Sequence, residues 1–88
     1  MANLDIRYAP SFVRLYDKLG RELQIEIKEK VALFLDRKNH KQLKVHKLKG
    51  SMDGRLSFSV NYHIRIVFRY KGKDTAELLT VGDHDIYK

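Results

Sequence analysis

Apolar and polar side chains alternate along two segments in the second half of the chain. In residues 56–60, leucine, phenylalanine and valine are separated by serines, and in residues 64–70 a similar alternation places Arg65 and Arg69 between apolar positions. A period of two predicts strands that are half buried. One face of the resulting sheet is expected to be apolar and to cover helices, and the other to be polar and to carry the arginines.

A third strand is predicted after a tight connection. Residues 71–74 read Lys-Gly-Lys-Asp, which is typical of a hairpin turn. Residues 75–82 then have the composition of a strand. The adjacent Leu78 and Leu79 interrupt the alternation, so the pattern does not decide which side chains of this strand face the core. Between residues 38 and 50 the chain is dense in charge and is predicted to be a loop.

The first half of the chain predicts a strand and two helices. Residues 4–9 alternate loosely, and Pro10 with Ser11 marks a helix start in which Ser11 suits a cap. Apolar side chains at i, i+3, i+4 and i+7 predict a helix over residues 12–19, and a second amphipathic pattern covers residues 21–35. The expected architecture is α+β with two layers, in which an N-terminal strand and a helical hairpin pack on a mostly antiparallel sheet (β-α-α-β-β-β).

Size and charge narrow the class of protein. With 88 residues the chain has room for a single domain, 1–88. The net charge of +7 and the pI of about 9.8 favour a polyanionic partner, because lysine and arginine displace counterions from phosphates. Cysteine is absent, which excludes disulfides and thiolate metal sites. Without an apolar leader or a long apolar run, the chain is expected to be cytoplasmic and to have no membrane partner.

Candidate site residues lie on the polar face and near the end of the chain. Arg65 can bridge two phosphate oxygens, although a surface ion pair with Glu77 or Asp83 is the plainer alternative. His84 is flanked by aspartates and suits proton transfer, and Tyr87 can stack on a base, donate a proton or anchor the tail.

Further basic residues fill the surrounding sequence. His46 and His63 are alternative acid–base residues. Phosphate contacts are expected from four cations, each of which could equally belong to a solvated surface: Lys44, Lys47, Lys49 and Arg69. No ligand cluster with metal-binding spacing is present, so neither a metal nor another cofactor is expected.

Three short motifs together resemble the RelE/ParE toxin superfamily. They are the basic residues 47–50, the strand 64–68 and the C-terminal residues 81–87, in this order over nearly the whole chain. The resemblance implies the toxin of a type II toxin–antitoxin module with a cognate antitoxin. RelE-like members cut mRNA in the ribosomal A site, whereas ParE-like members inhibit DNA gyrase.

The resemblance also implies roles for individual residues. Arg65, His84 and Tyr87 match catalytic positions of RelE-like toxins, which act without a metal by attack of the ribose 2′-OH on the adjacent phosphate. This chain departs from RelE in the preceding strand, where Ser57 and Ser59 replace lysines. The resemblance therefore predicts a ribosome-dependent mRNA endonuclease, with a gyrase inhibitor or a catalytically silent antitoxin-binding protein as alternatives.

Overall fold

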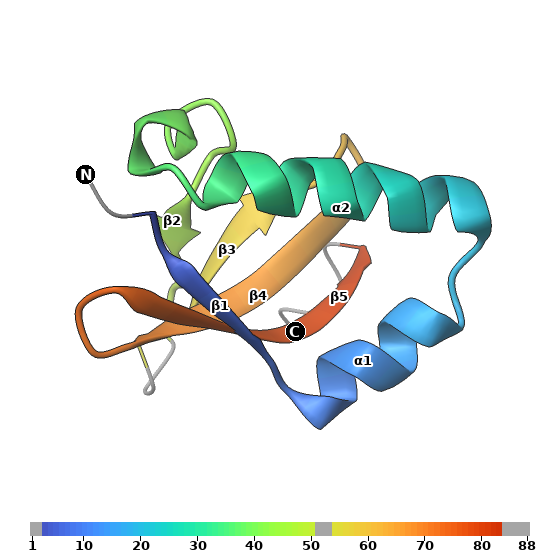
Figure 1. The fold of residues 1–88 in the computed structure, drawn as a ribbon, viewed down its shortest axis with the longest axis horizontal. Coiled ribbons are helices and arrows are strands. Elements are labelled where there is room, and N and C mark those ends of the chain that lie inside the picture. The colour runs from blue at the N-terminus through green and yellow to red at the C-terminus, as the bar shows by residue number, and fades with distance from the viewer. Residues whose placement is uncertain (1–2, 51–53, 84–88) are drawn as a thin grey trace.

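Helices and strands of this chain form two layers in a computed structural model, which describes residues 3–50 and 54–83 (Figure 1). The strands are β1 (Asp5–Tyr8), β2 (His46–Lys47), β3 (Leu56–Ser59), β4 (Ile64–Lys71) and β5 (Thr75–Asp83). The helices are α1 (Pro10–Asp17), α2 (Arg21–Phe34) and the short 3₁₀ helix η1 (Arg37–Asn39). No helix in these two described ranges is long and apolar enough to cross a membrane.

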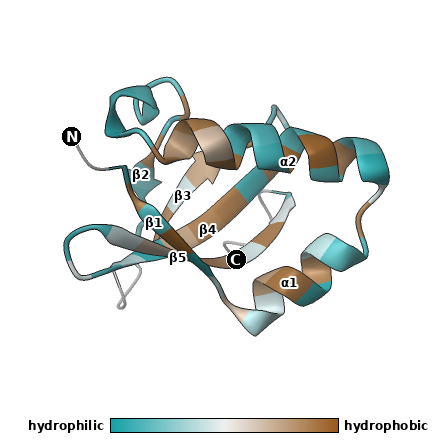
Figure 2. Ribbon diagram, in the orientation of Figure 1, coloured by the Kyte–Doolittle hydropathy of each residue, from teal (hydrophilic) through white to brown (hydrophobic). Residues whose placement is uncertain are grey.

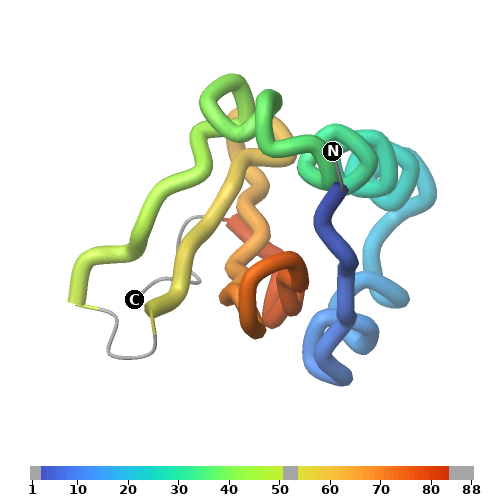
Figure 3. Tube along the Cα trace, turned by 60° about the vertical axis from the view of Figure 1, so that its left-hand side comes forward, coloured from blue at the N-terminus to red at the C-terminus, as the bar shows by residue number. Residues whose placement is uncertain are grey.

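The five strands form one sheet in the order β1-β5-β4-β3-β2. β1 runs parallel to β5, and the other neighbours are antiparallel, so the predicted α+β architecture is confirmed. β2 was not predicted, because two residues are too short for a period to be visible. It lies within the charged segment that was expected to be a loop, and it extends the sheet beyond β3 (Figure 3).

The core lies between α2 and the helix-facing side of the sheet. α2 buries Ile27, Val31 and Phe34 at helical spacing, and the apolar residues of β4 lie beneath it (Figure 2). The Phe34 ring stacks on Phe58 with centroids 4.3 Å apart and meets the edge of Phe68 at 4.7 Å. All three phenylalanines are fully buried, so this aromatic cluster packs α2 against the sheet.

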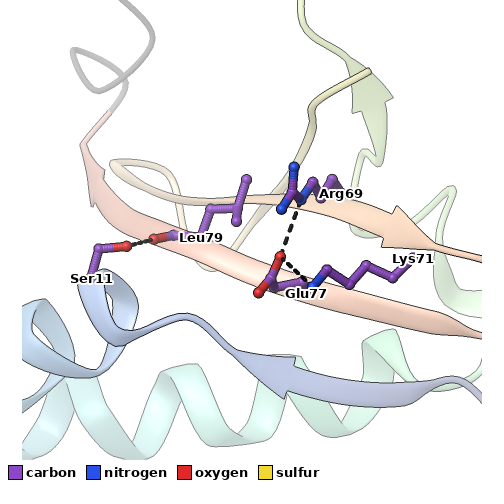
Figure 4. A network of polar contacts seen from close by, with 5 residues as sticks. All are labelled: Ser11, Arg69, Lys71, Glu77 and Leu79. Carbon is purple, nitrogen blue, oxygen red and sulfur yellow. Dashed lines mark hydrogen bonds and ion pairs between the residues drawn. The ribbon is translucent and has the colours of Figure 1, made fainter. Parts of the chain in front are cut away.

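The start of α1 differs from the prediction that Ser11 caps the helix. Ala9 occupies the cap position without a side-chain bond, and Pro10 begins the helix. The Ser11 hydroxyl instead donates a hydrogen bond to the backbone oxygen of Leu79 at 2.6 Å (Figure 4). The Ala9 N–H donates to the oxygen of Leu78 at 2.9 Å, so α1 is fastened to β5.

The two adjacent leucines of β5 form an irregularity in the sheet. Val67 pairs with Thr80, but the next residue, Phe68, pairs with Leu78, so Leu79 has no partner in the ladder. Such a bulge shifts the alternation of the strand by one residue. Leu78 and Val81 both point into the core as a result, which resolves the facing that the sequence left open.

The second face of the sheet is not wholly polar, which corrects the prediction. Val67 is 2% exposed although it lies outside the main core cluster, and Ser57, its register partner, is fully buried. The middle of this face is therefore closed to solvent. Polar, partly exposed residues are found toward its ends, where Arg65 and Arg69 lie.

Replacing Phe34 with alanine is expected to lower the free energy of unfolding by about 3–5 kcal/mol, because a large buried ring is lost and leaves a cavity. Urea denaturation followed by far-UV circular dichroism measures the change. Ile25→Ala in the same helix is the control, since Ile25 is 50% exposed. That variant should differ from the parent by no more than about 0.5 kcal/mol. Equal effects of the two substitutions would contradict the assignment of the core.

Candidate functional site

Arg65 lies in β4 between Ser59 of β3 and Gly82 of β5, its register partners. The side chain is partly buried, and its Nη1 donates a hydrogen bond to the backbone oxygen of Asn61 at 2.9 Å. Within residues 3–50 and 54–83, all hydrogen bonds of this guanidinium come from Nη1. Among these residues, the donors on Nε and Nη2 have no hydrogen-bond partner, while the Nη1 side of the guanidinium is held in place.

The ion pair that was weighed for Arg65 belongs to Arg69 instead. Glu77 stands opposite Arg69 in the sheet, and its Oε1 accepts from Nε at 3.1 Å while Lys71 Nζ lies 3.7 Å away (Figure 4). No carboxylate of the described residues pairs with Arg65. Of the two arginines on this face, Arg69 is thus the one that a carboxylate of the described residues engages.

A single asparagine, which the sequence analysis missed, organises the turn that holds Arg65. The Oδ1 atom of Asn61 accepts hydrogen bonds from the backbone N–H groups of His63 and Ile64 at 2.8 and 2.9 Å. Its Nδ2 donates to Oε1 of Glu26 in α2 at 2.8 Å. The signal was present, since an asparagine between two strands often bonds to the backbone two residues later. The turn is thus fixed both internally and against the helix layer.

Two exposed rings project from the same turn. Tyr62 is 87% exposed, and its ring meets His63 edge-on with centroids 5.1 Å apart. The His63 side chain is exposed as well, so a ligand can reach it. Of the histidines considered for acid–base chemistry, His63 is the one that the described structure places on the Arg65 turn.

The predicted lysines lie around the edge strand β2. Lys44 adopts a left-handed conformation with φ of 60°, Lys47 is in β2 and Lys49 follows it, and all three are exposed. No ion pair engages any of them within the part of the chain that the structure describes. They form a basic edge that phosphates can reach.

His46 belongs to this basic edge rather than to the Arg65 turn. Its Nδ1 lies 2.7 Å from the backbone oxygen of Lys44, and in the sheet register it stands opposite Ser57. Arg65 stands opposite Ser59, one strand farther along the sheet. No contact joins His46 to Arg65 among the described residues, so the two candidate positions are not brought together.

His84 and Tyr87, the other predicted catalytic residues, lie outside the described residues. The described part of β5 ends with Gly82 opposite Arg65 and Asp83 opposite Ile64. The chain therefore reaches the level of Arg65 just before residue 84, and both roles stay predictions. No three histidine, aspartate or glutamate side chains of the described ranges gather in a way that could hold a metal ion.

An apolar groove of about 360 Å³ lies on the helix side of the sheet. Aromatic and aliphatic side chains of β1, α1 and α2 line it, together with the charged residues Asp17 and Lys28. None of the residues predicted for the site takes part in it. The apolar groove and the Arg65 turn are therefore separate features of the surface.

Comparisons with solved structures identify the fold. The chain is similar to the RelBE2 toxin–antitoxin complex of Mycobacterium tuberculosis, with 18% identity, coverage of 92% of this chain and 98% of that chain, and a TM-score of 0.75. It is also similar to the DinJ–YafQ complex of E. coli, with 17% identity, coverage of 96% of both chains and a TM-score of 0.74. The RelE–RelB complex of Pyrococcus horikoshii is similar with 15% identity, coverage of 92% of this chain and 94% of that chain, and a TM-score of 0.69. No protein-family model matches the sequence, and no curated protein is significantly similar to it.

These similarities confirm the structural part of the predicted resemblance. The two helices and the five-stranded sheet form a RelE-like fold over almost the entire length of the compared chains. At such low identities a shared fold leaves the chemistry to be argued from the residues of this chain.

Replacing Asn61 with alanine is expected to destabilise the protein by about 1–3 kcal/mol, because two backbone donors and the Glu26 carboxylate lose their partner. Amide hydrogen exchange gives the sharper readout. The N–H groups of His63 and Ile64 should exchange faster in this variant than in the parent. Glu26→Gln is the matched control, since its amide oxygen can still accept from Asn61, and it should leave both exchange rates nearly unchanged. Unaltered exchange in Asn61→Ala would contradict the geometry of the turn.

Proposed function

We propose that this protein is the toxin of a type II toxin–antitoxin module and that it cleaves translated mRNA in the ribosomal A site. Its support is a RelE-like fold shared with proteins solved in toxin–antitoxin complexes, together with a net charge of +7. The observation that carries the proposal is the Arg65 guanidinium, which is oriented by the backbone oxygen of Asn61 and whose Nε and Nη2 have no hydrogen-bond partner among the described residues.

The proposed reaction is an internal transesterification. The ribose 2′-oxygen attacks the adjacent phosphorus, and the bond from phosphorus to the 5′-oxygen breaks. The products are a 2′,3′-cyclic phosphate and a free 5′-hydroxyl. Because the substrate supplies its own nucleophile, the protein has to orient the phosphate, stabilise negative charge and move two protons. Arg65 stabilises the charge on the pentavalent phosphorus, and no cofactor is needed.

Proton transfer is assigned to the histidines. His84 is the proposed general acid or base, with Tyr87 stacking on a base or donating a proton. His63 is the alternative that the geometry supports, because it is exposed on the turn that holds Arg65. His46 is the weaker alternative, since it lies at the basic edge with its Nδ1 against the Lys44 oxygen.

Binding of the substrate and of the partner would both use the positive surface. Lys44, Lys47 and Lys49 hold rRNA or mRNA phosphates, with Arg69 as a secondary contact. A cognate antitoxin with an acidic segment is the proposed partner, in which a helix or strand lies across the basic face or the sheet edge. Such a segment would block access to Arg65 and so neutralise the toxin.

A second candidate function is supported by the serines of β3. Ser57 is fully buried and Ser59 is partly buried, so neither position offers an exposed cation of the kind that RelE carries in this strand. A protein without these cations could act on DNA gyrase, or bind only its antitoxin. These alternatives predict intact mRNA when the protein is expressed alone.

Arg65→Ala is expected to slow mRNA cleavage by on the order of a hundredfold or more, the usual effect of removing one group that stabilises transition-state charge. Primer extension on a reporter mRNA in a translating extract measures the rate. Arg14→Ala is the control, because Arg14 is exposed on α1. It changes the net charge by the same amount and should leave cleavage almost unchanged. Both variants should keep the far-UV spectrum of the parent protein.

Two results would contradict the proposal in different ways. Cleavage by Arg65→Ala at the parent rate would remove Arg65 from the site. Intact mRNA with the parent protein, together with failing gyrase-dependent supercoiling, would establish the ParE-like function instead. If the proposed function holds, the parent protein should cut naked RNA poorly, because the ribosome supplies part of the positioning.

Glutamine substitutions distinguish the three candidate histidines, since glutamine keeps hydrogen bonding but cannot exchange a proton in this pH range. His84→Gln is expected to lose most cleavage while ribosome binding is retained. His46→Gln should act like the parent protein. If His63→Gln is the inactive variant, the acid–base role moves to the Arg65 turn. Single-turnover cleavage and ribosome co-sedimentation are the two measurements.

Tyr87 substitutions separate stacking from proton donation. If the ring stacks, Tyr87→Phe should be mild and Tyr87→Ala severe, and if the hydroxyl donates a proton, both should be severe. The same cleavage assay applies. Full activity in both variants would show that Tyr87 is not part of the site.

A further inference from the structure

Tyr62 stands out because a large aromatic side chain is presented to solvent on a rigid turn. It is 87% exposed, more than the other exposed large hydrophobic residues of the described chain. Its neighbours in sequence, Asn61 and His63, are polar, so no apolar patch of the turn itself surrounds the ring. The ring contributes little to the core and is free to meet a ligand.

The turn that carries Tyr62 is held on three sides. Asn61 fixes it internally through the N–H groups of His63 and Ile64, and Glu26 ties it to α2. Arg65 holds it from β4, since Nη1 donates to the backbone oxygen of Asn61 at 2.9 Å and lies 3.5 Å from the backbone oxygen of Tyr62. Because the backbone of the turn is already fixed, only the two side-chain torsions of Tyr62 remain to be ordered when a ligand binds, which favours stacking.

The turn also joins an aromatic ring to a cation. The guanidinium that is proposed to hold the phosphate bonds to the backbone that bears Tyr62, so the charge and the attachment point of the ring are held close together. The His63 ring is nearly perpendicular to the Tyr62 ring, at 85°, so at least one face of the tyrosine ring is not covered by it. A nucleotide presents the matching pair of groups, a planar base and an anionic phosphate.

We propose that Tyr62 is a base-stacking residue that holds an unpaired RNA base beside the phosphate bound by Arg65. This inference rests on the proposed function and adds to it a specific contact that positions the substrate. Stacking on an aromatic face tolerates any base, so Tyr62 contributes affinity and alignment rather than sequence preference.

A protein partner is a less suitable occupant of this position. Aromatic anchors at protein interfaces are enclosed by neighbouring contacts that exclude water, whereas Tyr62 projects from a polar turn. The apolar groove between α1 and α2, on the helix side of the sheet, has the lining that a protein segment requires. The same variants can decide between RNA and protein, because binding to each is measured separately.

The first experiment titrates the full chain with a single-stranded oligoribonucleotide at low salt. Stacking should shift the Tyr62 ring resonances upfield, and Tyr62→Ala should weaken binding by on the order of tenfold. Tyr62→Phe should bind like the parent, because the ring is kept. Tyr8→Ala is the matched control, since Tyr8 is 52% exposed in β1, and its affinity should not change. An oligonucleotide without bases should bind the parent and Tyr62→Ala equally.

The second experiment measures mRNA cleavage in a translating extract, where Tyr62→Ala should be slower than Tyr62→Phe by a similar factor. Unshifted ring resonances up to millimolar oligonucleotide, or equal affinities of Tyr62→Ala and the parent, would overturn the inference. Loss of antitoxin binding with unchanged RNA binding would assign the ring to a protein contact and overturn it too. If the parent binds RNA through Tyr62 yet cleaves no mRNA, stacking stands and the proposed endonuclease function falls.

Discussion

The stacked pair of Phe34 and Phe58 determines how the two layers meet. With centroids 4.3 Å apart, the rings bring the end of α2 onto β3, and Phe68 of β4 closes the cluster from the side. Once the even-numbered apolar residues of β4 face this helix, the pleat sends the intervening residues to the opposite side. Arg65 therefore points away from the core as a direct consequence of how Phe68 and Ile66 are buried.

The bulge at Leu79 completes this arrangement. The hairpin sets Arg69 opposite Glu77, and an unbroken ladder continuing from that pair would put Val81 opposite Arg65. Residues directly opposite in an antiparallel pair share a face, so Val81 would then leave the core. The extra residue returns Val81 to the core and brings Gly82 beside Arg65. The chemistry of the second face thus depends on one unpaired leucine.

Periodicity was sufficient to predict most of the fold. The two helices, the three C-terminal strands and the order of the layers follow from repeats of 3.6 and two residues, which report burial on one side. Burial on the face of the sheet that points away from the helices was not predictable. Ser57 is polar and small, and only the assembled sheet shows that its position is closed. β2 was missed because His46 and Lys47 are held by the neighbouring strand rather than by any pattern of their own.

For the candidate site, the sequence proposed residue types, whose roles stay predictions, and it indicated the geometry only in part. Arg65 was expected on the second face, but its partner is a backbone oxygen, and the sequence does not reveal which main-chain groups a side chain will meet. The Glu77 carboxylate went to Arg69 because the hairpin register places them opposite each other. Asn61 was missed although an asparagine between two strands is a turn signal. Its three side-chain hydrogen bonds shape the turn and tie it to α2, and no chemical role draws attention to it.

The parallel pairing of β1 with β5 has a consequence for the order of folding. β1 leaves the ribosome first, yet its ladder partner begins at Thr75, and the Ser11 hydroxyl bonds to an oxygen 68 positions later. Contacts this far apart in sequence form late, because closing a long loop costs entropy before any contact compensates for it. Until β5 has been synthesised, β1 and α1 have no sheet edge on which to pack. A nascent chain therefore cannot assemble the strand that stands beside Arg65 until nearly all of the described sequence has been synthesised.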